Sequence, residues 1–138
     1  MTAYAPVTDA LRASLQEALG PAHVLARAED VEPYAHDETE HRRHPPELVV
    51  RPASTAEVQA VLQAAYAAGV PVTPRGGGTG LSGGALPVEG GIVLVLDRMD
   101  AILDIDEPNL ACVVQPGVIT QVLHQAVEAK GLYYPPDP

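Results

Sequence analysis

Hydrophobic residues recur at helical spacing in three stretches of the chain, residues 9–19, 55–68 and 120–130. In each stretch leucine, valine or alanine returns every three or four positions, which places the apolar side chains on one face of a helix. A glycine follows each stretch directly (Gly20, Gly69 and Gly131). Glycine readily adopts the left-handed conformation that ends many helices. The pattern therefore predicts three amphipathic helices.

Polar residues at the starts of two of these helices support the prediction. Ser54 and Glu57 have the spacing of a capping box. In that motif the serine hydroxyl accepts a hydrogen bond from the Glu57 amide, and the Glu57 carboxylate accepts one from the Ser54 amide. Thr120 is expected to cap the last helix with its hydroxyl.

Shorter apolar runs predict strands at residues 48–50, 70–73, 92–96, 102–105 and 111–114. Residues 92–96 are apolar without interruption, which is typical of a central parallel strand with both faces buried. The strand–helix–strand order over residues 48–73 predicts a parallel pair joined by a right-handed crossover. The last two runs flank turn-forming residues and predict a hairpin.

These elements together predict the α/β class (α+β by a stricter definition), as a small parallel sheet with crossover helices and a hairpin. Residues 27–47 are polar, charged and rich in histidine and proline. We interpret them as an irregular connection, because they offer few apolar anchors.

Composition narrows the range of partners. The 138 residues are 46% hydrophobic, which suits one domain with a packed core. They include 18 acidic and 8 basic side chains, a formal charge of −10, which argues against binding to nucleic acid or to an anionic membrane surface. No apolar run reaches the roughly 20 residues of a membrane-spanning helix, and the single cysteine, Cys112, excludes an internal disulfide. We therefore expect a soluble, cytoplasmic protein.

The glycines are concentrated in one region. Eight of the 12 lie within residues 76–91, directly after a predicted strand. Glycine has no Cβ and permits positive φ, so successive amides can converge on one anionic group. Thr79 and Ser82 would add hydroxyl donors. The loop therefore predicts a cradle for a pyrophosphate, and a flexible surface loop is the alternative.

Two better-known phosphate motifs do not fit this loop. The spacing Gly78-x-Gly80-x-x-Gly83 matches the dinucleotide fingerprint, but that fingerprint requires a helix to begin at its third glycine. Pro87 and two further glycines follow before the next strand, so no helix fits and we exclude a Rossmann-type NAD site. No Lys-Ser/Thr pair ends the loop, which excludes a P-loop as well.

Residues 71–85 closely resemble the FAD pyrophosphate loop of flavoproteins of the vanillyl-alcohol-oxidase / p-cresol-methylhydroxylase (PCMH) type. Further segments along the chain are similar to the same family (residues 34–39, 49–52, 91–99, 114–118 and 131–138). The resemblance thus covers nearly the whole chain. Within the family, the chain is most similar to the flavin subunit of glycolate oxidase and to D-lactate and D-2-hydroxyglutarate dehydrogenases.

The resemblance implies two regions and a set of cofactor contacts. Residues 1–47 would be an N-terminal helix and irregular connection, and residues 48–138 the N-terminal part of an FAD-binding PCMH-type domain that is incomplete at the C-terminus. The implied FAD-binding residues are Arg75, Gly76, Gly77, Gly78, Thr79, Gly80, Leu81, Ser82, Gly83, Gly84, Ala85, Pro136 and Asp137. Many relatives attach the flavin covalently through a histidine in this loop. Here Gly78 and Thr79 occupy that place, which implies non-covalent FAD.

The resemblance also implies a reaction. It points to the FAD-binding portion of an oxidoreductase that oxidises a D-2-hydroxy acid, glycolate or D-lactate, by hydride transfer to the flavin. The catalytic residues would lie in the part of the family that this chain lacks, so this segment alone is expected to be inactive. Partner subunits of a glycolate oxidase complex are implied as well. The alternatives are a non-catalytic nucleotide- or anion-binding module and an inactive fragment.

Other reactive side chains have ordinary explanations. The histidines and carboxylates of residues 36–44 are metal-ligating types, but neighbouring prolines and arginines favour a solvated loop, so we expect no metal site. Cys112 is expected to be a small buried hydrophobic residue. Arg75 would lie beside the phosphates or form a surface ion pair, and the sequence leaves both open. Tyr133 and Tyr134 are expected to pack rather than to stack on a flavin.

Overall fold

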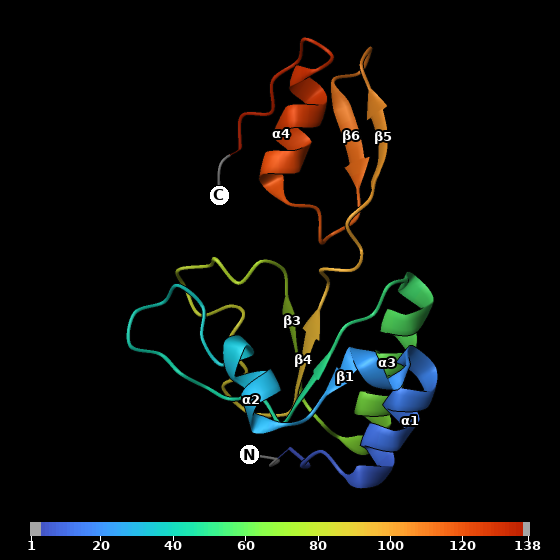
Figure 1. Cartoon of the computed structure of the whole chain (residues 1–138), viewed down its shortest axis with the longest axis vertical. Coiled ribbons are helices and arrows are strands. Elements are labelled where there is room, and N and C mark those ends of the chain that lie inside the picture. The colour runs from blue at the N-terminus through green and yellow to red at the C-terminus, as the bar shows by residue number, and fades with distance from the viewer. Residues whose placement is uncertain (1–3, 137–138) are drawn as a thin grey trace.

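A four-stranded sheet forms the lower half of the molecule in Figure 1, in a computed structural model that describes residues 4–136. The strands are β1 (Val24–Leu25), β2 (Leu48–Val50), β3 (Val72–Arg75) and β4 (Ile92–Val95), in the order β1-β2-β4-β3. Both β2 and β3 pair with β4 in parallel, and β1 pairs with β2 in the antiparallel sense. The predicted strands at residues 48–50 and 70–73 are therefore parallel but not neighbours, because β4 lies between them.

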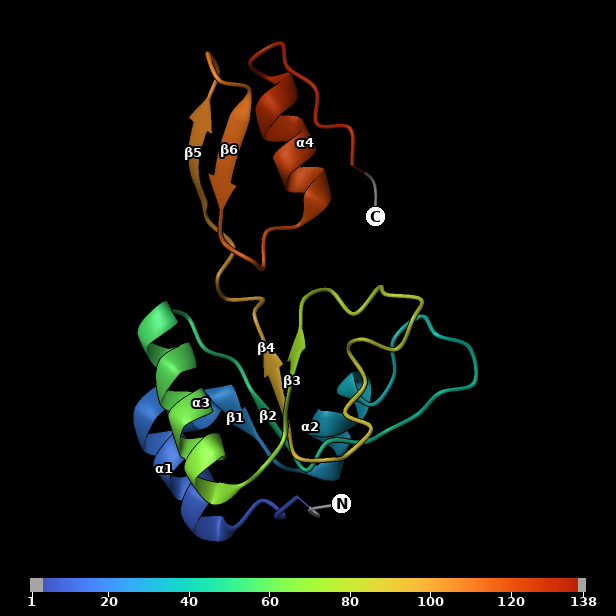
Figure 2. The same cartoon turned by 180° about the vertical axis from the view of Figure 1, so that it is seen from behind.

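Helices cover both faces of this sheet. Helices α1 (Asp9–Leu19) and α3 (Thr55–Ala68) lie on one face, and the short helix α2 (Ala28–Val31) lies on the other (Figures 1 and 2). Alternate residues of the strands supply the two cores, since side chains alternate between the faces of a sheet. On β4, Ile92 and Leu94 join the larger core with α1 and α3, and the two valines face the smaller one. All four β4 residues are buried, which confirms the prediction of a central strand.

The ends of α3 follow from local sequence signals. The Ser54 hydroxyl accepts a hydrogen bond from the Glu57 amide at 3.2 Å, as the capping box predicts. The Glu57 carboxylate, however, accepts from the Ala53 amide at 2.7 Å rather than from Ser54. At the other end Gly69 has φ of +66°, and the next residue, Val70, donates its amide to Ala65. Val70 thus belongs to the helix end, which is why β3 begins two residues later than the sequence predicts.

The region interpreted as an irregular connection contains short elements. Within residues 27–47 these are α2 and a 3-10 turn, η2 (Glu32–Tyr34), while β1 and another 3-10 turn, η1 (Pro21–His23), lie just before the region. Elements of two to four residues are too short to show a hydrophobic period, so sequence patterns do not reveal them.

A hairpin and one helix form the upper half of the molecule, beyond the carboxyl ends of β3 and β4 (Figure 1). The hairpin strands β5 (Ile102–Asp106) and β6 (Ala111–Val114) are antiparallel, as predicted. Helix α4 (Thr120–Glu128) packs beside them through Leu123 and Val127, which are buried. The Lys130 ammonium, 2.6 Å from the Glu107 carboxylate, ties the end of α4 to the tip of the hairpin.

The start of α4 differs from its predicted form. Thr120 is the first helical residue, and Ile119 occupies the N-cap without a side-chain hydrogen bond. The first amides of any helix lack partners within the helix. Among the described residues, no side chain accepts a hydrogen bond from the first amides of α4.

No helix among residues 4–136 is long and apolar enough to cross a membrane.

Core packing between α1 and α3 provides a test of this architecture. Leu15 on α1 is 1% exposed, whereas Leu62 on α3 is 47% exposed. We expect Leu15→Ala to lower the free energy of unfolding by about 2–5 kcal/mol, because it leaves a cavity between packed elements. Leu62→Ala should change it by about 0.5 kcal/mol or less. Urea unfolding followed by circular dichroism measures both, and equal effects would contradict the described core.

Candidate cofactor site

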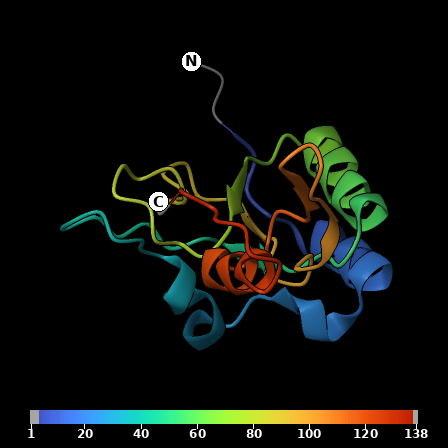
Figure 3. The ribbon, with the colours of Figure 1, turned by 90° about the horizontal axis from the view of Figure 1, so that it is seen from above.

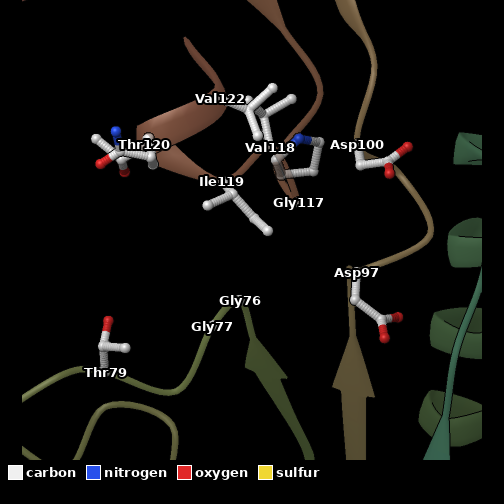
Figure 4. Close-up of a pocket in the computed structure, with 12 residues that line it drawn as sticks. Gly76, Gly77, Thr79, Asp97, Asp100, Gly117, Val118, Ile119, Thr120 and Val122 are labelled. Carbon is white, nitrogen blue, oxygen red and sulfur yellow. The ribbon is translucent and has the colours of Figure 1, made fainter. Parts of the chain in front are cut away.

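A cavity of about 440 Å³ lies where the two halves of the molecule meet. The start of the glycine loop (residues 76–85) forms one side of the cavity, and the turn before α4 forms the other (Figure 4). The lining residues are Gly76, Gly77, Thr79, Asp97, Asp100, Pro116, Gly117, Val118, Ile119, Thr120, Gln121 and Val122. This position is at the carboxyl ends of parallel strands, where open sheets with helices commonly bind ligands.

The glycine loop brings unpaired amides to this cavity. Among the described residues, no oxygen accepts a hydrogen bond from any amide of residues 76–84. Most of these residues are exposed. Unpaired backbone donors that converge beside a cavity suit an anionic group. The loop therefore has the donors that a pyrophosphate needs.

The glycines of this loop fall into two classes. Gly78 and Gly83 have φ of +73°, so the backbone itself requires glycine there. At Gly76 and Gly84, φ is outside the left-handed region, and a Cβ at either position would have no atom within 4 Å. The protein's own packing does not require glycine at these two positions. The open space at both positions leaves room for a ligand to approach the backbone.

Gly117 holds the opposite side of the cavity against the sheet. A Cβ at this position would overlap with the carbonyl oxygen of Leu96, just beyond β4. The Gly117 amide donates to the Met99 carbonyl at 2.8 Å. Residue 117 must therefore be glycine for the turn before α4 to come this close to the end of β4.

The cavity is bordered by a positive helix start and by two aspartate side chains. The uncapped first turn of α4 carries the positive end of the helix dipole, which attracts anions. Asp97 and Asp100 lie on the other side of the cavity (Figure 4). The Asp97 carboxylate is paired with the Arg51 guanidinium at 2.7 Å, which offsets its charge. The pairing leaves the α4 end of the cavity favourable for an anion.

Arg75 is buried against the glycine loop, so it does not form the surface ion pair considered from the sequence. It is 8% exposed, and its Nη1 donates to the His36 carbonyl oxygen at 2.8 Å. Its guanidinium carbon is 5.7 Å from the centre of the Tyr34 ring. A Cβ on Gly78 would overlap with this guanidinium. Arg75 therefore fills the space that Gly78 leaves open.

Asp37 also lies beneath the loop, which corrects the interpretation of residues 36–44 as wholly solvated. It is 8% exposed, and its Oδ1 accepts from the Thr39 amide at 2.9 Å. Burial raises the pKa of the Asp37 carboxyl, but the hydrogen bond from the Thr39 amide, the nearby Ala85 amide and the charge of Arg75 lower the pKa by more. Its pKa therefore lies below the ordinary value, and Asp37 is ionised at neutral pH.

The structure brings together part of the predicted site. Gly76, Gly77 and Thr79 line the cavity, whereas residues 81–85 do not, and Leu81 is 77% exposed. The Pro136 carbonyl oxygen lies 3.1 Å from the His124 Nε2 of α4. The segment between α4 and Pro136 runs back toward the glycine loop (Figures 1 and 3). Asp137 lies outside the described residues.

Residues 116–122 line the cavity although the sequence did not point to them as site residues. Two local signals were available, namely Pro116-Gly117 before the helix and an apolar residue, Ile119, where a capping side chain is usual.

Other candidate groups lie away from this cavity. Within residues 4–136 no group of three or more His, Cys, Asp or Glu side chains is placed to hold a metal ion. Cys112 is half-buried rather than fully buried, beside the apolar groove between the hairpin and α4. Tyr133 is 77% exposed, and the Tyr134 ring packs against His124 with ring centres 5.5 Å apart.

Comparison with known proteins identifies the family. Residues 46–138, more than half of the chain, match a family described as FAD binding domain. The chain belongs to the FAD-binding-domain family. This match confirms the resemblance and FAD as the cofactor that the resemblance implies.

Curated relatives of this FAD-binding domain are oxidoreductases. The chain is 49% identical over 105 residues to "Glycolate oxidase subunit GlcD" of Bacillus subtilis, covering 76% of this chain and 22% of the relative. It is 41% identical over 132 residues to "D-2-hydroxyglutarate dehydrogenase" of Stutzerimonas stutzeri, covering 95% and 28%. It is 39% identical over 136 residues to "D-lactate dehydrogenase" of Anaerostipes hadrus, covering 98% and 28%. The chain thus spans about a quarter of the length of these relatives.

Solved structures confirm the fold of the FAD-binding domain. Substrate-bound p-cresol methylhydroxylase superposes with a TM-score of 0.80 at 24% identity, covering 93% of this chain and 27% of that chain. A 4-ethylphenol oxidase from Gulosibacter chungangensis gives a TM-score of 0.78 at 30% identity, covering 94% and 27%. The PCMH-type fold predicted from the sequence is therefore correct.

The residues present fit an FAD pyrophosphate. The cavity combines unpaired loop amides, a glycine (Gly76) that the protein's own packing does not require, and an uncapped helix start. These features need no lysine or arginine at the phosphates, because backbone donors supply the hydrogen bonds.

The close approach of Gly117 can be tested without cofactor. We expect Gly117→Ala to lower the free energy of unfolding by about 1–3 kcal/mol, because the new methyl group must displace backbone at Leu96. Gly84→Ala, where a Cβ meets open space, is the matched control and should be near neutral. Urea unfolding measures both. Equal stability of the two variants would contradict the contact between the turn and β4.

Ionisation of Asp37 predicts a pH dependence. A carboxyl whose pKa is lowered by folding stabilises the protein above its unfolded-state pKa, and that contribution is lost as pH falls through the folded-state pKa. We expect wild type to be more stable than Asp37→Asn between pH 5 and 8, and this difference to shrink below about pH 4. Glu38→Gln, which removes the neighbouring exposed charge, should show little difference across the range. Thermal unfolding at each pH measures the difference in stability between wild type and each variant. A difference between wild type and Asp37→Asn that grows in acid would contradict the described contacts.

Proposed function

We propose that this chain binds FAD non-covalently in the cavity between the glycine loop and the start of α4. The observation that carries this proposal is Gly76, which lines the cavity although neither φ nor neighbouring atoms require glycine there. Gly84, farther along the loop, is likewise not required by either. Beside them lie amides without protein acceptors among the described residues. A pyrophosphate that sits against the backbone explains both features together.

Two segments on opposite sides of the cavity would bind the pyrophosphate. Residues 76–80, with Gly84, would donate amides to the pyrophosphate, and the first turn of α4 would add its helix dipole. The Ala85 amide, implied as a further contact by the sequence, faces Asp37 instead. Pro136 would lie at the flavin side of the site. Val118 and Ile119 would keep water from the cofactor, because they line the cavity with apolar surface. We propose no catalytic residue within the chain.

The reaction class is proposed from the names of the relatives. Glycolate oxidase, D-2-hydroxyglutarate dehydrogenase and D-lactate dehydrogenase all take small 2-hydroxy acids by name. We propose that the whole protein oxidises a D-2-hydroxy acid such as glycolate or D-lactate. When bound, FAD would accept the hydride from the substrate. Residues 48–138 would form the FAD-binding part, residues 1–47 would support it, and partner subunits are proposed because one relative is named a subunit. The cytoplasmic location inferred from the sequence stays a prediction.

FAD titration tests the cofactor proposal directly. We expect purified wild-type protein to bind FAD, and Gly76→Val to lower the affinity by about 100-fold or more, since its branched side chain occupies the approach of the phosphate. The stability of the FAD-free variant should be unchanged, because no atom lies near the new Cβ. Flavin fluorescence and calorimetry measure the affinity, and acid precipitation should release the flavin into solution.

Ala67→Val is the matched control, because it adds the same methyl groups on the exposed side of α3. It should bind FAD as wild type does. Equal affinity of Gly76→Val and wild type would overturn the cradle. Binding of ADP as tightly as FAD would favour the alternative, a nucleotide-binding module without flavin chemistry.

A further inference from the structure

Residues 34–39 lie against the underside of the glycine loop. The contacts are spread along the loop rather than gathered at one end. Arg75, next to Gly78, donates to the His36 carbonyl oxygen. Farther along, the loop meets the side chains of Asp37 and Thr39. None of residues 34–39 is among those that line the cofactor cavity, so the segment contacts the loop outside the cavity.

The Asp37 carboxylate lies between two separate parts of the loop. A Cβ on Gly80 would lie 4.0 Å from the Asp37 Oδ2. The Ala85 amide, at the far end of the loop, faces the same carboxylate and lowers its pKa. Gly83 approaches the Thr39 hydroxyl, since a Cβ on Gly83 would lie 4.0 Å from the Thr39 Oγ1. One buried carboxylate thus backs both the middle and the end of the loop.

Burying the polar groups of Asp37, Thr39 and Arg75 without full pairing costs free energy of folding. The Asp37 Oδ2 and Thr39 Oγ1 atoms are buried and have no hydrogen-bond partner among the described residues. Arg75 carries a buried charge and, among those residues, has no carboxylate within ion-pair distance. Buried polar groups left without full pairing are rare and concentrate at sites with a function.

We propose that Asp37 and Arg75 are positioning residues that hold the glycine loop from beneath, so that its amides are arranged for a pyrophosphate before the cofactor arrives. Arg75 fixes the start of the loop through His36 and the space beside Gly78. Asp37 fixes its middle and its end. A loop of glycines is costly to order on binding, because glycine has the largest conformational freedom. A loop already held in place loses less freedom when it binds. The effect on FAD rests on the proposed function, whereas the anchoring of the loop does not.

Trypsin tests the anchoring without any cofactor. It cleaves after arginine, and the Arg75 side chain is 8% exposed in the held loop. We expect Asp37→Asn to raise the initial rate of cleavage between residues 75 and 76 by about tenfold, the factor that one hydrogen bond to a charged group corresponds to. Glu38→Gln removes one negative charge from the exposed neighbour and should cleave at the wild-type rate. Mass spectrometry of the fragments assigns the bond, and Arg75→Gln should abolish this cleavage.

Cleavage after Arg98 serves as the internal reference, since Arg98 lies beyond β4 and its guanidinium donates to the Arg51 carbonyl oxygen rather than to the segment around Asp37. In Asp37→Asn only the cleavage after Arg75 should rise. If cleavage after Arg98 rises equally, the variant has opened the whole fold and the positioning role is overturned. If neither rate changes, the anchoring by Asp37 is likewise overturned.

FAD affinity supplies the second measurement. Asp37→Asn should weaken FAD binding by about tenfold, by the same reasoning, with the melting temperature of the FAD-free protein lowered only slightly. Arg75→Lys should restore part of the affinity lost in Arg75→Gln, because lysine keeps the charge and one donor to His36. Wild-type affinity in Asp37→Asn overturns the positioning role. Absence of FAD binding in wild type would instead refute the proposed function, and the trypsin result would still decide whether Asp37 holds the loop.

Discussion

The position of β4 between β2 and β3 is the constraint on which the candidate site depends. All four residues of β4 are buried, and the strand pairs in parallel on both sides. Parallel pairing brings the carboxyl ends of the three strands to one edge of the sheet. The glycine loop leaves from the end of β3, and the chain that leaves β4 turns back at Gly117 against Leu96. The cavity forms because the chain segments that leave β3 and β4 lie side by side.

Local sequence signals were sufficient for three of the four strands of this sheet, β2, β3 and β4, and for its two long helices, α1 and α3. The uninterrupted run at β4, the Ser54 cap and the glycine at residue 69 each act over a few residues, and each appears in the structure as predicted. The cavity required more than such signals. Residue 117 is glycine because a Cβ there would overlap with the Leu96 carbonyl oxygen. Arg75 is buried because its guanidinium fills the space beside Gly78 and donates to the His36 carbonyl oxygen. Contacts between distant segments leave no period or local motif in the sequence, so the loop was predicted while its opposite wall and its support were not.

A net charge of −10 does not conflict with an anionic cofactor. Bulk charge acts over distances that salt screens to about 8–10 Å, whereas a pyrophosphate is recognised by donors at contact distance. The Arg51–Asp97 pair offsets the charge of one nearby carboxylate, and the uncapped start of α4 supplies a fixed positive end. The chain therefore needs no cluster of basic side chains at the cavity. Its one buried arginine in this region, among the described residues, is used beneath the loop instead.

The buried position of Arg75 explains how a loop made of glycines is held in place. A glycine loop gains close approach of its backbone to a phosphate, but it gives up the side chains that would normally hold a loop in place. The missing packing has to come from elsewhere. Gly78 leaves a space that the guanidinium of Arg75 fills, and Gly80 leaves the carboxylate of Asp37 directly beneath the backbone. The upper side of the loop stays open to a ligand because its support comes from below, and a segment that resembles an ordinary polar connection in the sequence thereby becomes part of the site.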